Sequence, residues 1–113
     1  MTLIERLEVG KPEEQCELLV AFWEACNPDG ATFLKSYRYR LLLDCGAYLD
    51  AVMLLVPSWK IRGIHFNAPS ADERKWGCYL FGGREGEKQF NEFSSTPALA
   101  LAAAILKAKG DET

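Results

Sequence analysis

The sequence predicts an α+β fold, in which an antiparallel sheet of at least three strands packs with helices as an α/β sandwich within one domain, 1–113. Three observations lead to this prediction. Apolar residues recur at helical spacing in the first half of the chain, short runs of aromatic and β-branched residues follow from Trp59, and an almost wholly apolar segment comes last. The expected order is therefore N-terminal helices, a strand meander and an apolar C-terminal helix.

The N-terminal part is expected to form two helices. The first covers 2–9, because Thr2 and Glu5 have the spacing of a capping box. The second begins after Pro12 with acidic residues in its first turns, which suit the positive end of the helix dipole. It should end at 27–30, where the turn-forming sequence Asn-Pro-Asp-Gly stands.

The middle of the chain contains one ambiguous stretch and one clearer helix. In 31–43, Phe33 and Tyr37 fit a helix, whereas Tyr37 and Tyr39 fit a strand equally well, so both structures remain open. The segment 47–56 has apolar residues at helical spacing and is followed by proline, which predicts a helix that ends there.

Three strands and a final helix complete the predicted fold. The strands are expected at 59–66, 75–81 and 88–93. The glycine-rich link 82–86 tolerates positive φ angles, so the second and third strands should form an antiparallel hairpin. The last helix, 96–109, opens with a Thr-Pro pair and is apolar on almost every face, so it should lie at the centre of the molecule.

Alternation along the first predicted strand mixes polar and apolar side chains on both faces. Neither face is cleanly apolar, which indicates that part of the sheet surface is functional or covered by a partner. The expected faces are Trp59, Ile61 and His65 on one side, and Lys60, Arg62, Ile64 and Phe66 on the other.

The composition is that of an ordinary globular protein, with 49% hydrophobic and 26% charged residues. The formal net charge of -3 gives no general attraction for a phosphate backbone, so duplex nucleic acid is not an expected partner. No apolar run reaches the ~20 residues that span a bilayer, and the charged N-terminal segment lacks the apolar core of a signal peptide. We therefore expect a cytoplasmic protein without a membrane partner, which folds alone or as a small homo-oligomer.

The cysteines show neither a CxxC pair nor a nearby histidine, which argues against a zinc site. In the cytoplasm they are expected to be small, buried, reduced thiols, with a disulfide or a reactive thiol as the alternative. Neither a metal nor another cofactor is expected. The residues concerned are Cys16, Cys26, Cys45 and Cys78.

Two segments, AYLDAVMLLVPSW at 47–59 and STPALALAAAILKAKG at 95–110, together resemble the phage ABA sandwich domain family of small phage and prophage proteins. The opening IERLE at 4–8 is also common among these proteins. The resemblance implies an α/β sandwich and a phage or prophage origin, hence a location in the host cytoplasm. The family's biochemical role is largely unassigned. The matching residues are Leu49, Asp50, Ala51, Leu55, Val56, Pro57, Trp59, Thr96, Pro97, Ala98, Leu99, Ala100 and Leu101.

No catalytic site is recognisable in the sequence, so we do not expect an enzyme. His65 is the only histidine, and any catalytic dyad or triad based on histidine would depend on it; a structural or partly exposed strand histidine is the simpler interpretation. Asp50 belongs to the family-like motif, but a first-turn acid that suits the helix dipole explains it without a function.

A basic and aromatic segment offers the clearest candidate binding site. Tyr37, Arg38, Tyr39 and Arg40 interleave cations and rings, as a surface for phosphates and stacked bases would. The simpler interpretation is an amphipathic element whose tyrosines pack and whose arginines are solvated.

Two main functions fit the sequence. The first is a phage-type accessory protein that binds a host protein, for example a defence component, with Trp59 and Trp76 as aromatic anchors. The alternative is a sponge that sequesters a small nucleotide, with Arg38, Arg40 or Arg62 on its phosphates and a tyrosine or tryptophan on its base. A structural or orphan phage protein is the remaining alternative.

Overall fold

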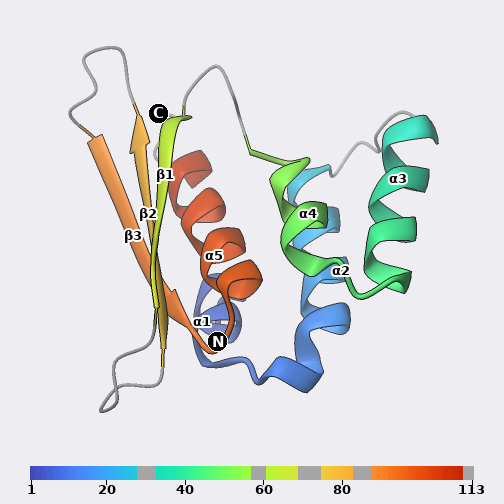
Figure 1. The fold of residues 1–113 in the computed structure, drawn as a ribbon, viewed down its shortest axis with the longest axis horizontal. Coiled ribbons are helices and arrows are strands. Elements are labelled where there is room, and N and C mark those ends of the chain that lie inside the picture. Colours follow the sequence, from blue (N-terminus) through green and yellow to red (C-terminus); the bar gives the residue numbers. More distant parts are fainter. Residues whose placement is uncertain (28–32, 57–60, 69–74, 83–87, 111–113) are drawn as a thin grey trace.

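The computed structural model describes residues 1–27, 33–56, 61–68, 75–82 and 88–110, with side chains at all of these except 33, 34, 61, 62 and 88 (Figure 1). Its elements confirm the predicted α+β class and the predicted order. In order they are α1 (Leu3–Val9), the 3-10 turn Pro12–Glu14, α2 (Gln15–Cys26), α3 (Phe33–Asp44), α4 (Tyr48–Met53), β1 (Ile61–Asn67), β2 (Trp76–Gly82), β3 (Lys88–Ser94) and α5 (Pro97–Gly110).

The elements form layers on one side of the sheet. The sheet has the antiparallel order β1-β2-β3, and α5 lies against it with α1 at its side (Figure 1). The helices α2 and α4 pack on the far side of α5, and α3 stands outermost (Figure 1). In the described part of the chain the helices therefore cover one face of the sheet, and the other face is open.

The C-terminal helix α5 is the centre of the core, as its apolar sequence predicts. Leu99, Leu101 and Ile105 are completely buried, together with a series of alanines. Alanine side chains let the sheet and the other helices approach the α5 backbone closely, which is why one helix can be enclosed on nearly all sides. The helix begins where Pro97 was expected to open it, and the Thr96 hydroxyl accepts a hydrogen bond from the Leu99 N–H at 3.2 Å.

Local signals also position the shorter helices. The predicted capping box is confirmed, because the Glu5 N–H donates to the Thr2 hydroxyl at 3.1 Å while the Thr2 N–H donates to the Glu5 carboxylate at 3.3 Å. The ambiguous stretch 31–43 is helical where described. Gly46, with a φ of 77°, makes the sharp reversal from α3 to α4. The helix expected over 47–56 is shorter, because it ends at Met53 in a tight turn.

The strands have a regular register with one interruption. Ile64 lies opposite Leu80 and His65 opposite Tyr79, so the alternation expected for these residues of β1 is confirmed. A register shift then places Ile61 opposite Gly82 and Gly63 opposite Phe81. A bulge therefore interrupts the ladder between Ile61 and Gly63, and the expected face of the Ile61 side chain lies outside the described part of the structure.

The two faces of the sheet have different surroundings. Cys78, Leu80 and Phe90 point toward α5 and are buried. Ser94 is buried as well, and its hydroxyl donates to the Leu7 carbonyl, which joins β3 to α1. The alternate side chains of β2 and β3 point away from the helices. Phe81, Gln89, Asn91 and Phe93 are exposed and Tyr79 is partly exposed.

Candidate functional site

The basic and aromatic segment forms most of α3, and the helix divides it between two faces. Tyr39 and Leu43 point inward and are each 3% exposed. Tyr37 and Leu41 lie on the outward side, with exposures of 54% and 45%. Both pairs are one helical turn apart, so the inward pair holds the helix in place while the outward pair is accessible.

Tyr39 is a packing residue in this arrangement. Its ring lies against Trp23 of α2, with 4.6 Å between ring centroids and 32° between ring planes. Its hydroxyl donates to the Leu19 carbonyl at 2.6 Å. Burial raises the pKa of Tyr39 well above its ordinary value, with smaller contributions from nearby cysteines, so the phenol stays protonated. Protein contacts therefore already use the Tyr39 ring and hydroxyl.

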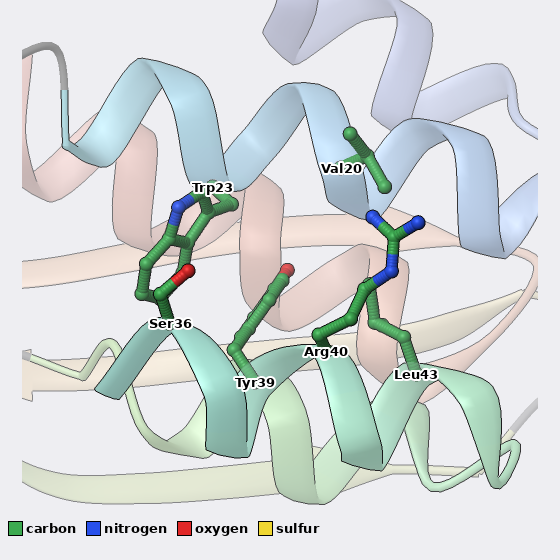
Figure 2. Close-up of a pocket in the computed structure, with 6 residues that line it drawn as sticks. All are labelled: Val20, Trp23, Ser36, Tyr39, Arg40 and Leu43. Atoms are coloured by element: carbon green, nitrogen blue, oxygen red, sulfur yellow. The ribbon is translucent and has the colours of Figure 1, made fainter. Parts of the chain in front are cut away.

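A small cavity lies between α2 and α3 and includes Arg40. Figure 2 shows the Arg40 side chain extending toward Val20 of α2, beside Tyr39. The cavity volume is about 60 Å³, whereas small-molecule sites have ~300 Å³ or more. Arg40 also approaches the Asp44 carboxylate at 3.8 Å, in a pair whose side chains are largely exposed and whose contribution to stability is small. This cavity is too small for a nucleotide. Its lining residues are Val20, Trp23, Ser36, Tyr39, Arg40 and Leu43.

The exposed side chains of α3 include one aromatic ring, one aliphatic side chain and three cations. Tyrosine and arginine are the residue types that contribute most to protein interfaces. Lysine and arginine also give this side of the helix a positive character on a chain whose net charge is -3. We refer to this region as the α3 surface. It consists of Lys35, Tyr37, Arg38, Arg40 and Leu41.

The other predicted site residues lie elsewhere in the molecule and do not form one site with the α3 surface. Asp50 is exposed in the first turn of α4, where the helix dipole suits a carboxylate. Trp76 is half-buried at a position of β2 opposite the buried Ser94, on the helix-facing side of the sheet. His65 lies on the other side and is exposed. Trp59 and the side chain of Arg62 lie outside the described part of the structure.

Sequence reasoning expected part of the sheet surface to be functional or covered, but it did not single out the aromatic residues of the open side. There, the exposed rings of Phe81 and Phe93 flank Tyr79, whose ring makes an edge contact with Phe93 at 6.0 Å and 88°. The signal was the alternation of Tyr79 and Phe81 with the apolar Cys78 and Leu80, which gives β2 two apolar faces. We refer to these outward side chains as the open sheet face. They are His65, Asn67, Tyr79, Phe81, Gln89, Asn91 and Phe93.

The cysteines differ in their surroundings, and all four are free. Cys78 is buried, and desolvation raises the pKa of its thiol to about 12. Burial also raises the pKa of the half-buried Cys26. Cys16 and Cys45 are exposed, so the expectation of a buried thiol is wrong for these two. Cys16 lies on the outer side of α2, and Cys45 lies in the turn after α3.

Among the described residues, no group of three or more His, Cys, Asp or Glu side chains could hold a metal ion. None of their helices combines the length and the apolar character needed to cross a membrane.

Comparisons of the chain with protein-family models, with curated proteins and with solved structures found no match. The described residues form a small α+β domain with a basic and aromatic helix at one side and an aromatic sheet face at the other.

Proposed function

We propose that this chain is a phage-type accessory protein without catalytic activity of its own, which binds a host protein through the α3 surface in the host cytoplasm. A component of host defence is the target that the phage resemblance favours, by analogy of context. The observation that carries the proposal is the exposed pair Tyr37 and Leu41, one turn apart on an outermost helix and flanked by cations.

The α3 surface suits the mode in which a helix docks into a groove. In that mode, apolar anchors one turn apart enter the groove and polar residues surround it. Complete burial of a large apolar side chain stabilises a complex by roughly 1.5–3 kcal/mol, so Tyr37 and Leu41 can supply a useful part of a binding energy. Tyr39 packs against α2 on the opposite side of the helix and holds α3 in place. Because α3 is already ordered, less conformational entropy is lost when a partner binds.

The charges of the α3 surface indicate an acidic partner. Arg38 follows Tyr37 on the exposed part of α3, Lys35 and Arg40 are exposed on the same helix, and Asp44 near Arg40 is the opposing charge. Complementary charges at the rim of an interface act mainly on the association rate and on specificity, and salt screens them. We therefore expect binding to a groove with a carboxylate rim, and an association rate that falls as salt rises.

The nucleotide sponge remains the alternative, since the same arginines could pair phosphates. The cavity of about 60 Å³ beside Arg40 favours the protein partner, because a nucleotide would need a larger site. A nucleotide that binds the folded chain would raise its melting temperature according to RT ln(1 + [L]/Kd), and Arg40→Ala would remove that rise.

The test is a quantitative capture from host lysate with the wild type, Tyr37→Ala, Arg38→Glu and a control, Val9→Ala. Val9 is a 62% exposed apolar residue on α1, far along the chain from the α3 surface. We expect one host protein that the wild type and Val9→Ala retain and that both α3 variants lose. A protein retained equally by all four chains, or a melting shift with a nucleotide and no captured protein, would contradict the proposal.

A further inference from the structure

The open sheet face is a defined layer of side chains on rigid strands. The register places His65 opposite Tyr79, Gln89 opposite Phe81 and Asn67 opposite Gly77. All of these positions point away from α5, and Figure 1 shows the described helices on the other side of the sheet. The outward layer is thus set by strand pairing and needs no rearrangement to meet a partner.

The rings of this face are preorganised and partly exposed. Phe81 and Phe93 are 39% and 41% exposed. Tyr79 holds the layer together, because its ring lies 6.0 Å from Phe93 and 6.1 Å from His65. The Phe93 and Tyr79 rings lie over Gly77, where an added Cβ would stand 3.0 Å from the Phe93 ring. A solvated antiparallel face usually carries polar side chains, so these exposed aromatic rings indicate contact with another surface.

The polar side chains described on this face are His, Asn and Gln. Gln89 donates from its amide to Asn91 at 2.8 Å, and a ring nitrogen of His65 lies 2.9 Å from the Asn67 side-chain oxygen. Among the described outward residues none is Asp, Glu, Lys or Arg, although 26% of the chain is charged. A polyanion such as single-stranded nucleic acid would find no cation among these side chains.

We propose that the open sheet face joins two copies of this chain into a face-to-face dimer. In a twofold dimer the same patch lies on both sides, so the patch as a whole meets a copy of itself. A patch with a net charge would meet the same charge on the second copy, whereas amides both donate and accept hydrogen bonds. The charge pattern therefore fits a second copy of an acidic chain better than a charged partner.

The register shows how the copies would meet. A twofold axis parallel to β2 places Phe81 over Phe81 of the second copy, Tyr79 over Tyr79, and Phe93 over Asn67. Sheets that pack in this way lie ~10 Å apart and cross at about -30°. The helices of each copy then form the outer layers, and both exposed phenylalanines are removed from water.

The size of the face indicates a reversible dimer. Three strands of seven residues have a face of about 14 by 23 Å, from a strand spacing of ~4.8 Å and a rise of ~3.3 Å. Stable complexes bury ~800 Å² per partner, which is more than such a face provides. We expect an association that depends on concentration, with monomers in dilute solution.

The experiment is sedimentation of the full chain from low micromolar to near-millimolar concentration. The wild type should rise from a monomer mass of 12.7 kDa toward twice that mass as concentration rises. Phe81→Lys places like charges against each other across the twofold axis and should stay monomeric at every concentration. Gln89→Lys, at the neighbouring exposed position, places a charge over Gly63 of the second copy, where no described carboxylate would pair with it, and serves as a second variant with the same expected loss.

The control is Tyr37→Lys, an equally drastic change of an exposed aromatic residue on α3. It should dimerise as the wild type does while it loses the proposed host partner, so the two proposals fail independently. Circular dichroism confirms that each variant is folded. A wild type that stays monomeric at the highest concentration, or folded lysine variants that dimerise as well as the wild type, would overturn the dimer.

Discussion

The Tyr39 hydroxyl donates a hydrogen bond to the Leu19 carbonyl at 2.6 Å, and this bond fastens the outermost helix α3 to α2. The Tyr39 ring lies on Trp23 at the same point, so one side chain supplies both a polar and an apolar contact between the two helices. The contacts of Tyr39 lie on the inner side of α3 and hold this helix in place. The position of the exposed α3 surface therefore depends on them.

Tyr39→Ala should therefore destabilise the fold by about 3–5 kcal/mol, the usual cost when a large buried ring is removed. Tyr39→Phe removes only the hydroxyl and should cost about 1 kcal/mol. Urea unfolding measures both. Tyr37→Phe is the matched control at an exposed position and should stay within about 0.5 kcal/mol of the wild type. Equal effects of Tyr39→Phe and Tyr37→Phe would show that the hydrogen bond does not stabilise α3.

Leu99→Asp should prevent folding, because it places a charge without a partner in a position that is completely buried at the centre of α5. Soluble expression and circular dichroism provide the measurement. Met53→Asp makes the same chemical change at a 45% exposed position of α4 and should leave the chain folded. A cooperative, soluble Leu99→Asp variant would mean that α5 is not the core helix.

Glu8 should make the protein less stable as pH rises from acid toward neutral. Burial raises the pKa of Glu8 above its usual 4.5, and so do the charge of Glu92 and a hydrogen bond to that carboxyl group. A raised pKa favours the protonated, folded form, so this contribution is complete below the unfolded-state pKa and is lost as pH rises through the folded-state pKa. Lys107, 3.3 Å from Glu92, opposes the effect in part.

Glu8→Gln should remove that contribution. Urea unfolding in mild acid and at neutral pH should show that the variant gains stability relative to the wild type as pH rises. Glu24→Gln, at an exposed position of α2, should show no such relative gain. A constant difference between Glu8→Gln and the wild type over this range would contradict the proposed coupling of Glu8 to Glu92.

The thiols should react with an alkylating reagent in two groups. Cys16 and Cys45 are exposed and should be labelled quickly in the folded protein. Cys78 should be labelled only after unfolding, because it is buried and its pKa of about 12 keeps the thiol protonated. Mass spectrometry of partly labelled protein gives the order. Early labelling of Cys78 would mean that the sheet opens readily.

Local signals in the sequence predicted much of the fold. The Thr2 and Glu5 capping box and the apolar α5 each depend on neighbouring residues, and both are confirmed. The stretch 31–43 could not be assigned, because the contact of Tyr39 with Trp23 that accompanies its helical form is tertiary and leaves no periodic signal.

The candidate sites were less predictable for the same reason. Tyr37 and Tyr39 look alike in the sequence, and only the packing of α3 separates an exposed ring from a buried one. The open sheet face depends on the pairing of three strands and on which side the helices cover, both of which are properties of the whole fold. The register shift before Gly63 likewise depends on strand pairing, which simple alternation in the sequence does not reveal.

Site-specific photo-crosslinking in the host cell tests the central claim most directly. A photoreactive aromatic amino acid would replace Tyr37 on the α3 surface, and in a separate control it would replace Met53, which is exposed on α4. The account predicts one covalent adduct with a host protein from position 37, its loss when Arg38→Glu is added, and no such adduct from position 53. The same adduct from both positions, or none from position 37, would contradict a host partner at the α3 surface.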